Sequence, residues 1–118
     1  MKMMIAGSRH FNSNETFIDA LHEFIDRQSR KPEAILLDYD LKDYRFFKYA
    51  LSYANKNKIH LIVESAHSFL GKQGGQIKLK KLIGSADHCI YFTNEKKSTP
   101  LELECRRQNK SLHVFISK

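Results

Sequence analysis

Short apolar runs alternate with longer amphipathic stretches along the whole of this 118-residue chain. The runs are too brief for buried helices and have the length of strands that are buried on both faces. They predict five β-strands, at residues 3–6, 34–37, 59–63, 88–92 and 112–116.

Between these runs, apolar residues recur at helical spacing. The pattern predicts helices over residues 15–28 and 43–57, and a basic segment over 71–83 that becomes helical towards its end. Asn12, three residues before Glu15, resembles a capping box. Thr99, Pro100 and Glu102 combine a hydroxyl N-cap, a proline at the first helical position and an acid at the third, which predicts a last helix there.

Strands that are separated by helices of this length favour right-handed βαβ units. We therefore predict one α/β domain over residues 1–118, with about five mostly parallel strands and helices on both faces of the sheet. With 42% hydrophobic and 28% charged residues, the composition is that of a globular protein. No apolar run reaches membrane-spanning length, and Cys89 and Cys105 are too few for a disulfide framework. We expect a cytoplasmic protein without a membrane partner.

The net charge of +7 is unevenly distributed along the chain. Residues 1–50 hold 8 basic and 8 acidic side chains, so the whole excess lies in residues 51–118. An anionic partner there is one interpretation, and a solvated lysine surface is the other. Lys72, Lys78, Lys80 and Lys81 have no acidic residue among them, which keeps nucleic-acid binding as an alternative.

In an open parallel sheet, ligands bind beyond the carboxyl ends of the strands. The loop after the first strand begins with Gly7, Ser8 and Arg9. Glycine allows backbone to approach a ligand, serine offers a hydroxyl, and arginine offers a forked donor for phosphate. This loop is therefore our first candidate for an anion site.

Three stretches of the chain carry a recognisable pattern, in this order: residues 4–11, Met-Ile-Ala-Gly-Ser-Arg-His-Phe, then residues 71–78, then residues 86–92. They resemble the I-x-G-S-R-x-F opening and the G-K-x-A-G-x-I-R-N and A-D-x-x-I-x-F stretches of the YspA-like branch of the SLOG superfamily, whose relatives include DprA and the LOG phosphoribohydrolases. Ser98 and Thr99 stand where the family has Gly-Thr. The resemblance implies a Rossmann-like three-layer sandwich that binds nucleotides or nucleotide-derived ligands.

The chain departs from that pattern after the second strand. The family has a glycine-rich turn there, whereas this chain reads Asp38-Tyr39-Asp40-Leu41-Lys42-Asp43. These carboxylates would repel phosphate unless they face away or pair with Lys42 or Arg9. Lys78-Leu79 likewise replaces the family's Arg-Asn pair. The acidic spacing lacks the glycine and distal glutamate of an EF-hand, so we predict neither a metal site nor a cofactor.

Our hypothesis is a small protein that binds a nucleotide-derived ligand, which could be a signalling molecule, without turnover. It would act as a sensor or a sequestering protein, and a virus-encoded role against host defence is part of this hypothesis. A nucleotide N-glycosidase similar to LOG, with Asp40 or Glu64 as its carboxylate, is one alternative. A basic module that binds nucleic acid or a host protein is another, and the sequence also allows a homo-oligomer. The candidate ligand-binding residues are Gly7, Ser8, Arg9, His10, Asp40, Gly71, Lys72, Gly74, Gly75, Lys78, Ser98 and Thr99.

Overall fold

The computed structural model describes residues 1–28, 30–64, 74–95 and 99–117, and only the backbone of residues 74–77. Its elements are β1 (Lys2–Gly7), α1 (Asn14–Gln28), β2 (Ala34–Asp38), the 3-10 turn η1 (Tyr39–Leu41), α2 (Arg45–Asn57), β3 (His60–Glu64), α3 (Gly74–Ser85), β4 (His88–Thr93), α4 (Pro100–Arg107) and β5 (Ser111–Ile116). The five predicted strands are confirmed to within one residue at each end.

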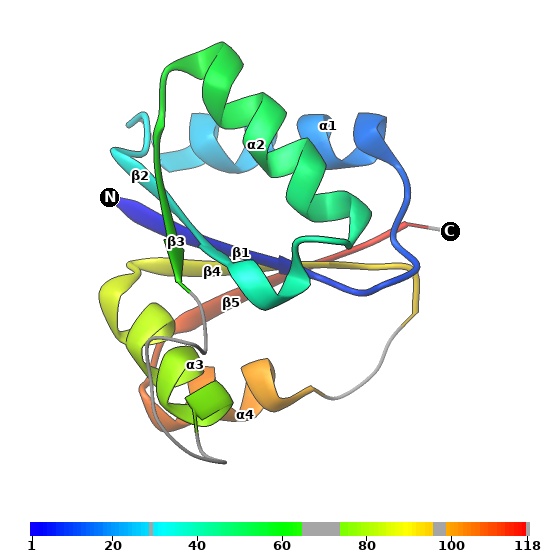
Figure 1. The fold of residues 1–118 in the computed structure, drawn as a ribbon. Helices are drawn as coiled ribbons and strands as arrows, with labels where there is room; N and C mark the ends of the chain where they lie inside the picture. Colours follow the sequence, from blue (N-terminus) through cyan, green and yellow to red (C-terminus); the bar gives the residue numbers. More distant parts are fainter. Residues whose placement is uncertain (29, 65–73, 96–98, 118) are drawn as a thin grey trace.

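The five strands form one parallel sheet in the order β3-β2-β1-β4-β5. Figure 1 shows α1 and α2 together on one face of this sheet and α3 and α4 on the other. The prediction of a mostly parallel sheet between two helical layers is therefore confirmed, and the order is that of a Rossmann-like fold.

The buried strands explain why the sequence runs are continuously apolar. On β1, Met3 and Ile5 pack in the core under α1 and α2, whereas Met4 and Ala6 pack in the core under α3 and α4. All four side chains are at most 6% exposed. Because alternate residues of a strand face opposite sides, a strand that is covered on both sides needs apolar residues at every position.

Two helix starts differ from the predictions. At α1, the hydroxyl of Ser13 accepts a hydrogen bond from the N–H of Thr16 at 3.2 Å, so Ser13 takes the capping role that we assigned to Asn12. At α2, the helix begins at Arg45 and not at residue 43, because residues 39–41 first form η1. The Asp38 side chain supports η1 by accepting from the N–H of Asp40 at 2.9 Å.

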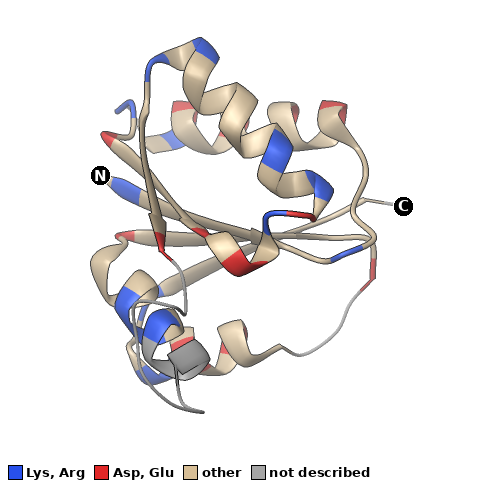
Figure 2. Cartoon of the chain, in the orientation of Figure 1, with Lys and Arg blue, Asp and Glu red and all other residues tan. Residues whose placement is uncertain are grey.

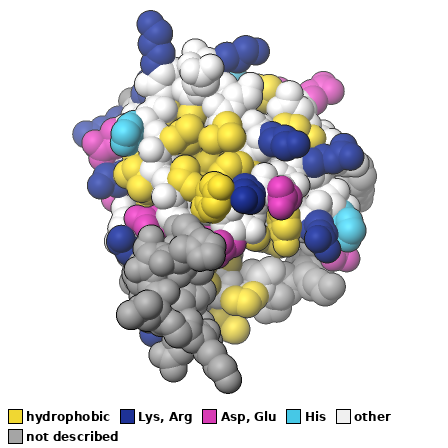
Figure 3. Space-filling view, viewed as in Figure 1, with side chains coloured by type: hydrophobic (Ala, Val, Ile, Leu, Met, Phe, Trp, Pro, Cys, Tyr) yellow, Lys and Arg dark blue, Asp and Glu magenta, His cyan; other side chains and the backbone are white. Residues whose placement is uncertain are grey.

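The outermost strands are the least covered parts of the sheet. Every residue of β3 and of β5 is exposed or half-buried, whereas all residues of β1 except the first are buried. Figure 3 shows that apolar side chains also reach the surface on one face of the molecule, with Lys and Arg at their border.

Among the described residues, no helix combines the length and the hydropathy needed to cross a membrane.

Candidate functional site

A cavity of about 570 Å³ lies beyond the carboxyl ends of β1 and β4. At this point the strand order reverses, since the chain proceeds outward from β1 to β2 and β3 and then returns to β4 on the other side. Open α/β sheets bind ligands in the crevice at such a switch point. The described residues that line it are Met4, Ala6, Gly7, Ser8, Arg9, His10, Asp38, Leu41, Tyr44, Leu79, Tyr91, Glu95, Thr99, Pro100 and Leu101.

Five of the predicted site residues meet in this cavity. They come from two distant segments, Gly7 to His10 after β1 and Thr99 at the start of α4. Gly71, Lys72 and Ser98 lie outside the described residues. Gly74 and Gly75 form the start of α3, where the structure describes only the backbone.

Ser8 is held firmly in place but has an unused hydroxyl. Its N–H donates to the carbonyl of Phe92 at 2.8 Å, and its carbonyl accepts from the N–H of Phe11 at 3.3 Å. Its Oγ is buried and has no hydrogen-bond partner in the part of the chain that the structure describes. Buried hydroxyls are normally satisfied, so an unpartnered one at a cavity wall is a candidate ligand contact. Arg9 and His10, which follow it, are exposed.

Gly7 has a packing role that the sequence did not reveal. A Cβ atom at this position would lie 2.8 Å from the Cγ and Cδ1 atoms of the Phe46 ring. Phe46 is fully buried, so the ring has no space into which it could move. The glycine is therefore explained by its contact with α2, whatever ligand the cavity holds.

The acidic turn after β2 is partly compensated from within the protein, by one lysine that pairs with two of its carboxylates. Lys78 of α3 is only 4% exposed, and its Nζ lies 2.7 Å from Oδ1 of Asp38 and also pairs with Asp40. Burial lowers the pKa of Lys78, but hydrogen bonds to the two carboxylates outweigh it, so the pKa is raised. We call these three residues the Lys78 ion cluster.

This cluster differs from the pairing that the sequence suggested. Lys42 is directed to Tyr39 instead, since its Nζ donates to the Tyr39 hydroxyl at 3.3 Å and lies 4.6 Å from the centre of the ring. Lys78 and Asp40 are thus engaged with each other, and their contact with a ligand stays a prediction. Asp38 alone of the cluster lines the cavity.

Thr99 combines a structural role with a position at the site. Its Oγ1 accepts from the N–H of Glu102 at 3.3 Å, and Pro100 occupies the first helical position, so the predicted helix start is confirmed. The first turn of α4 faces the cavity through Pro100 and Leu101. A mutation of Thr99 would therefore affect both the helix and the site.

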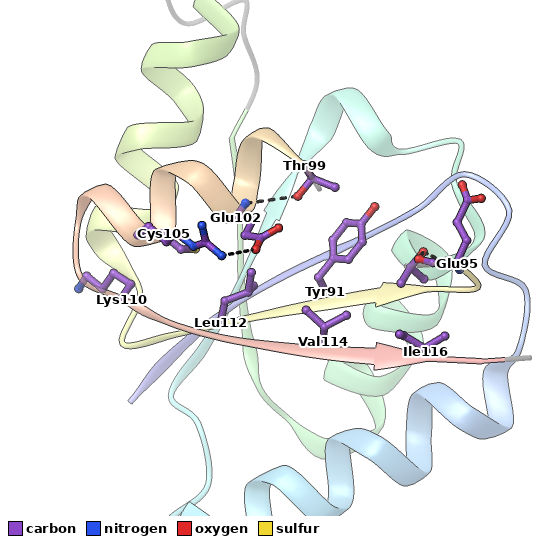
Figure 4. Close-up of a pocket in the computed structure, with 11 residues that line it drawn as sticks. Tyr91, Glu95, Thr99, Glu102, Cys105, Lys110, Leu112, Val114 and Ile116 are labelled. Atoms are coloured by element: carbon purple, nitrogen blue, oxygen red, sulfur yellow. Dashed lines mark hydrogen bonds and ion pairs between the residues drawn. The ribbon is translucent and has the colours of Figure 1, made fainter. Parts of the chain in front are cut away.

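A second hollow of about 350 Å³, which the sequence analysis missed, lies beside the first along β5 (Figure 4). Leu112, Val114 and Ile116 of β5 and Tyr91 of β4 point into it below α4. Tyr91, Glu95 and Thr99 line both hollows. The available signal was the last strand, with apolar residues at alternate positions, preceded by so short a helix as α4.

The basic segment does not form one free lysine surface. Lys78 is buried in its ion cluster, the Nζ of Lys81 lies 3.3 Å from Oε1 of Glu64, and Lys80 is exposed. Lys72 lies outside the described residues. Figure 2 shows Lys and Arg on helices of both layers, so the charge excess in the sequence does not correspond to a single face.

The described part of the chain holds no evident metal site and no reactive thiol. No three His, Cys, Asp or Glu side chains there are grouped as a metal site. Cys89 and Cys105 are both buried, and burial together with contact with Cys105 raises the pKa of Cys89 to about 12. A thiol with so high a pKa holds its proton at neutral pH and is a poor nucleophile.

These features define a Rossmann-like α/β protein with a crevice at the switch point of its sheet. Comparisons of the chain with protein-family models, with curated proteins and with solved structures find no match. The likeness to the SLOG superfamily thus rests on the motifs themselves and stays a prediction.

Proposed function

We propose that this protein binds a nucleotide or a nucleotide-derived ligand in the cavity beyond β1 and β4, and releases it unchanged. The observation that carries the proposal is Ser8, which precedes Arg9 and has a buried Oγ without a partner among the described residues, in the wall of a cavity at the switch point of a parallel sheet. Its volume of about 570 Å³ falls within the range of small-molecule sites.

The lining matches a ligand with an apolar ring and one anionic group. Met4, Leu79 and Leu101 supply apolar wall, and Tyr44 and Tyr91 offer aromatic rings. Arg9 is the residue among the described lining that holds a permanent positive charge. A phosphate bound by Arg9 and the Ser8 hydroxyl would leave the base against the apolar wall.

The Lys78 ion cluster argues against turnover. A glycosidase needs a carboxylate that faces the sugar. In the alternative hypothesis of a nucleotide N-glycosidase, Asp40 or Glu64 would be this carboxylate. Asp40 pairs with Lys78, and Glu64 pairs with Lys81. Asp40 compensates a buried ammonium group and is therefore poorly placed to stabilise a developing cation, and neither Asp40 nor Glu64 is among the described residues that line the cavity.

The proposal is tested by identifying what the protein carries and what it binds. Small molecules released by denaturing the purified protein are identified by mass spectrometry, and nucleoside monophosphates, cyclic nucleotides and dinucleotides are titrated by calorimetry. The Arg9→Ala variant should lose about 1.5–3 kcal/mol of binding free energy, the range for charge-assisted hydrogen bonds. Its melting temperature should be unchanged, because Arg9 is exposed. The matched control is Arg30→Ala. Arg30 is an exposed arginine that precedes the amino end of β2, whereas the cavity lies beyond the carboxyl ends of the strands.

Three results would overturn parts of this proposal. If Arg9→Ala binds every ligand as tightly as the wild type, the anion site is elsewhere. Repeated turnover to free base and ribose phosphate, abolished by Asp40→Asn, would establish the N-glycosidase instead. If no nucleotide binds while nucleic acid binds with a steep salt dependence, a basic surface is the functional one.

A further inference from the structure

The edge strand β5 is only partly covered on both faces of the sheet. On the α4 side, the hollow of about 350 Å³ leaves Val114 49% exposed and Ile116 47% exposed. On the α1 side, a second hollow of about 340 Å³ lies between β5 and Phe24, Arg27 and Gln28 of α1. Among the strands that the structure describes, β4 alone pairs with β5, so no described strand occupies the other edge of β5.

This edge lacks the usual protection against pairing with another strand. Natural edge strands carry charges, proline or bulges, or are very short. The six residues of β5, Ser-Leu-His-Val-Phe-Ile, contain no acidic, lysine, arginine or proline residue. The opposite edge strand β3 is shorter and ends in Glu64, which pairs with Lys81. The β5 edge is therefore better suited than the β3 edge to pair with a strand of another chain.

The charges around β5 favour a second copy of the same chain as the partner. The chain has a net charge of +7, so two copies repel each other overall. The described charged residues that line the two hollows are, by contrast, balanced, with three acidic and three basic side chains. They are Glu23, Glu95, Glu102, Arg27, Arg106 and Lys110.

These charges also lie in acid–base pairs, so the ion pairs within each copy can be replaced by ion pairs between two copies. Arg27 lies 2.6 Å from Glu23, and Arg106 lies 2.9 Å from Glu102, each pair along one exposed helix face. A two-fold axis brings the same surface to itself, so each acid of one copy can meet a base of the other. Another protein would need to match both hollows and both ion pairs independently.

We propose that two copies of this chain join their β5 strands in antiparallel fashion about a two-fold axis perpendicular to the sheet, which yields one ten-stranded sheet. Val114 and Ile116 of the two copies then pack against each other on the α4 side, where branched apolar side chains stabilise neighbouring strands. The interface borders the ligand cavity through Tyr91, Glu95 and Thr99, which line both hollows. The dimer is independent of what the cavity binds.

The test compares charge substitutions on the two edge strands by analytical ultracentrifugation over a range of concentrations. The wild type should reach twice the chain mass of 13.8 kDa. Val114→Lys should raise the dissociation constant at least about tenfold, because like charges then meet across the axis. Val63→Lys, at a position 41% exposed on β3, is the matched control and should leave the dimer intact. Circular dichroism and thermal melting verify that both variants fold.

Amide hydrogen exchange gives a second readout that needs no mutation. Exchange of residues 111–116 should slow as the protein concentration rises, whereas residues 60–64 should exchange at a constant rate. The proposal is overturned if the wild type stays at 13.8 kDa at all concentrations. It is equally overturned if a dimer forms and Val114→Lys leaves it intact, or if Val63→Lys is the variant that dissociates it.

Discussion

Replacing Lys78 by methionine should destabilise the fold more than any other removal of a single charge in the described chain. The side chain is 6% exposed, and its ammonium group pairs with Asp38, whose side chain is 14% exposed, and with Asp40, whose side chain is 39% exposed. Methionine keeps most of the volume of lysine, so packing changes little while both carboxylates lose their partner.

The expected loss follows from the burial of these two carboxylates. Breaking a buried ion pair by removing one partner costs about 3–5 kcal/mol. Because water can reach Asp40, the lower end of this range applies. For a chain of this size, 1 kcal/mol corresponds to about 4 °C in melting temperature, so Lys78→Met should melt about 12 °C below the wild type. Lys80→Met, an exposed lysine on the same helix, should change stability by less than about 0.5 kcal/mol.

A double variant separates charge from packing. In Lys78→Met with Asp38→Asn, the amide can still accept from the N–H of Asp40 but carries no charge, so at least half of the lost stability should return. The assay is urea unfolding followed by circular dichroism, analysed as a double-mutant cycle. A loss below about 1 kcal/mol in the single variant, or no recovery in the double one, would refute the ion cluster as a stabilising element.

The pH dependence provides an independent check of the same cluster. The pKa of Lys78 is raised in the folded state, so the stabilisation is present below the ordinary lysine value of 10.5 and is lost as the pH rises beyond it. The wild type should therefore lose stability above that pH more steeply than Lys78→Met.

Three further predictions concern packing, capping and protonation. Gly7→Ala should cost about 1–3 kcal/mol in urea unfolding, because its Cβ would overlap the buried Phe46 ring at 2.8 Å; an unchanged midpoint would contradict this contact. Thr99→Ala should cost about 1 kcal/mol and Thr99→Ser much less, and equal losses would rule out the capping hydroxyl. Burial, followed by the nearby His88, lowers the pKa of His113, so stability should fall as the pH drops through 6.5. His113→Gln should flatten this dependence, and an unchanged profile would assign it to another group.

The elements of this fold could be predicted from the sequence because their signals are local. A buried strand appears as a continuous apolar run, and the start of α4 is set by Thr99 and Pro100, which are adjacent in the chain. The start of α2 was less predictable. Asp43 fits a helical pattern, but the hydrogen bond from the N–H of Asp40 to the Asp38 side chain makes residues 39–41 form η1 first. A tertiary contact of Asp38, with Lys78, reinforces that local choice.

Only part of the site could be predicted from the sequence, because the rest depends on contacts between residues that are far apart in the chain. The loop after β1 does line a cavity, since the carboxyl ends of parallel strands must lie at one end of the sheet, and its contact with a ligand stays a prediction. The partner of the acidic turn was not predictable, because Lys78 lies 38 residues after Asp40 and no periodic pattern links them. From sequence, three carboxylates after β2 suggested either repulsion of phosphate or pairing with nearby cations. In the structure, a lysine that was expected to hold the ligand pairs instead with two of them, Asp38 and Asp40, so Arg9 is left as the cation that an anionic ligand can meet in the described cavity wall.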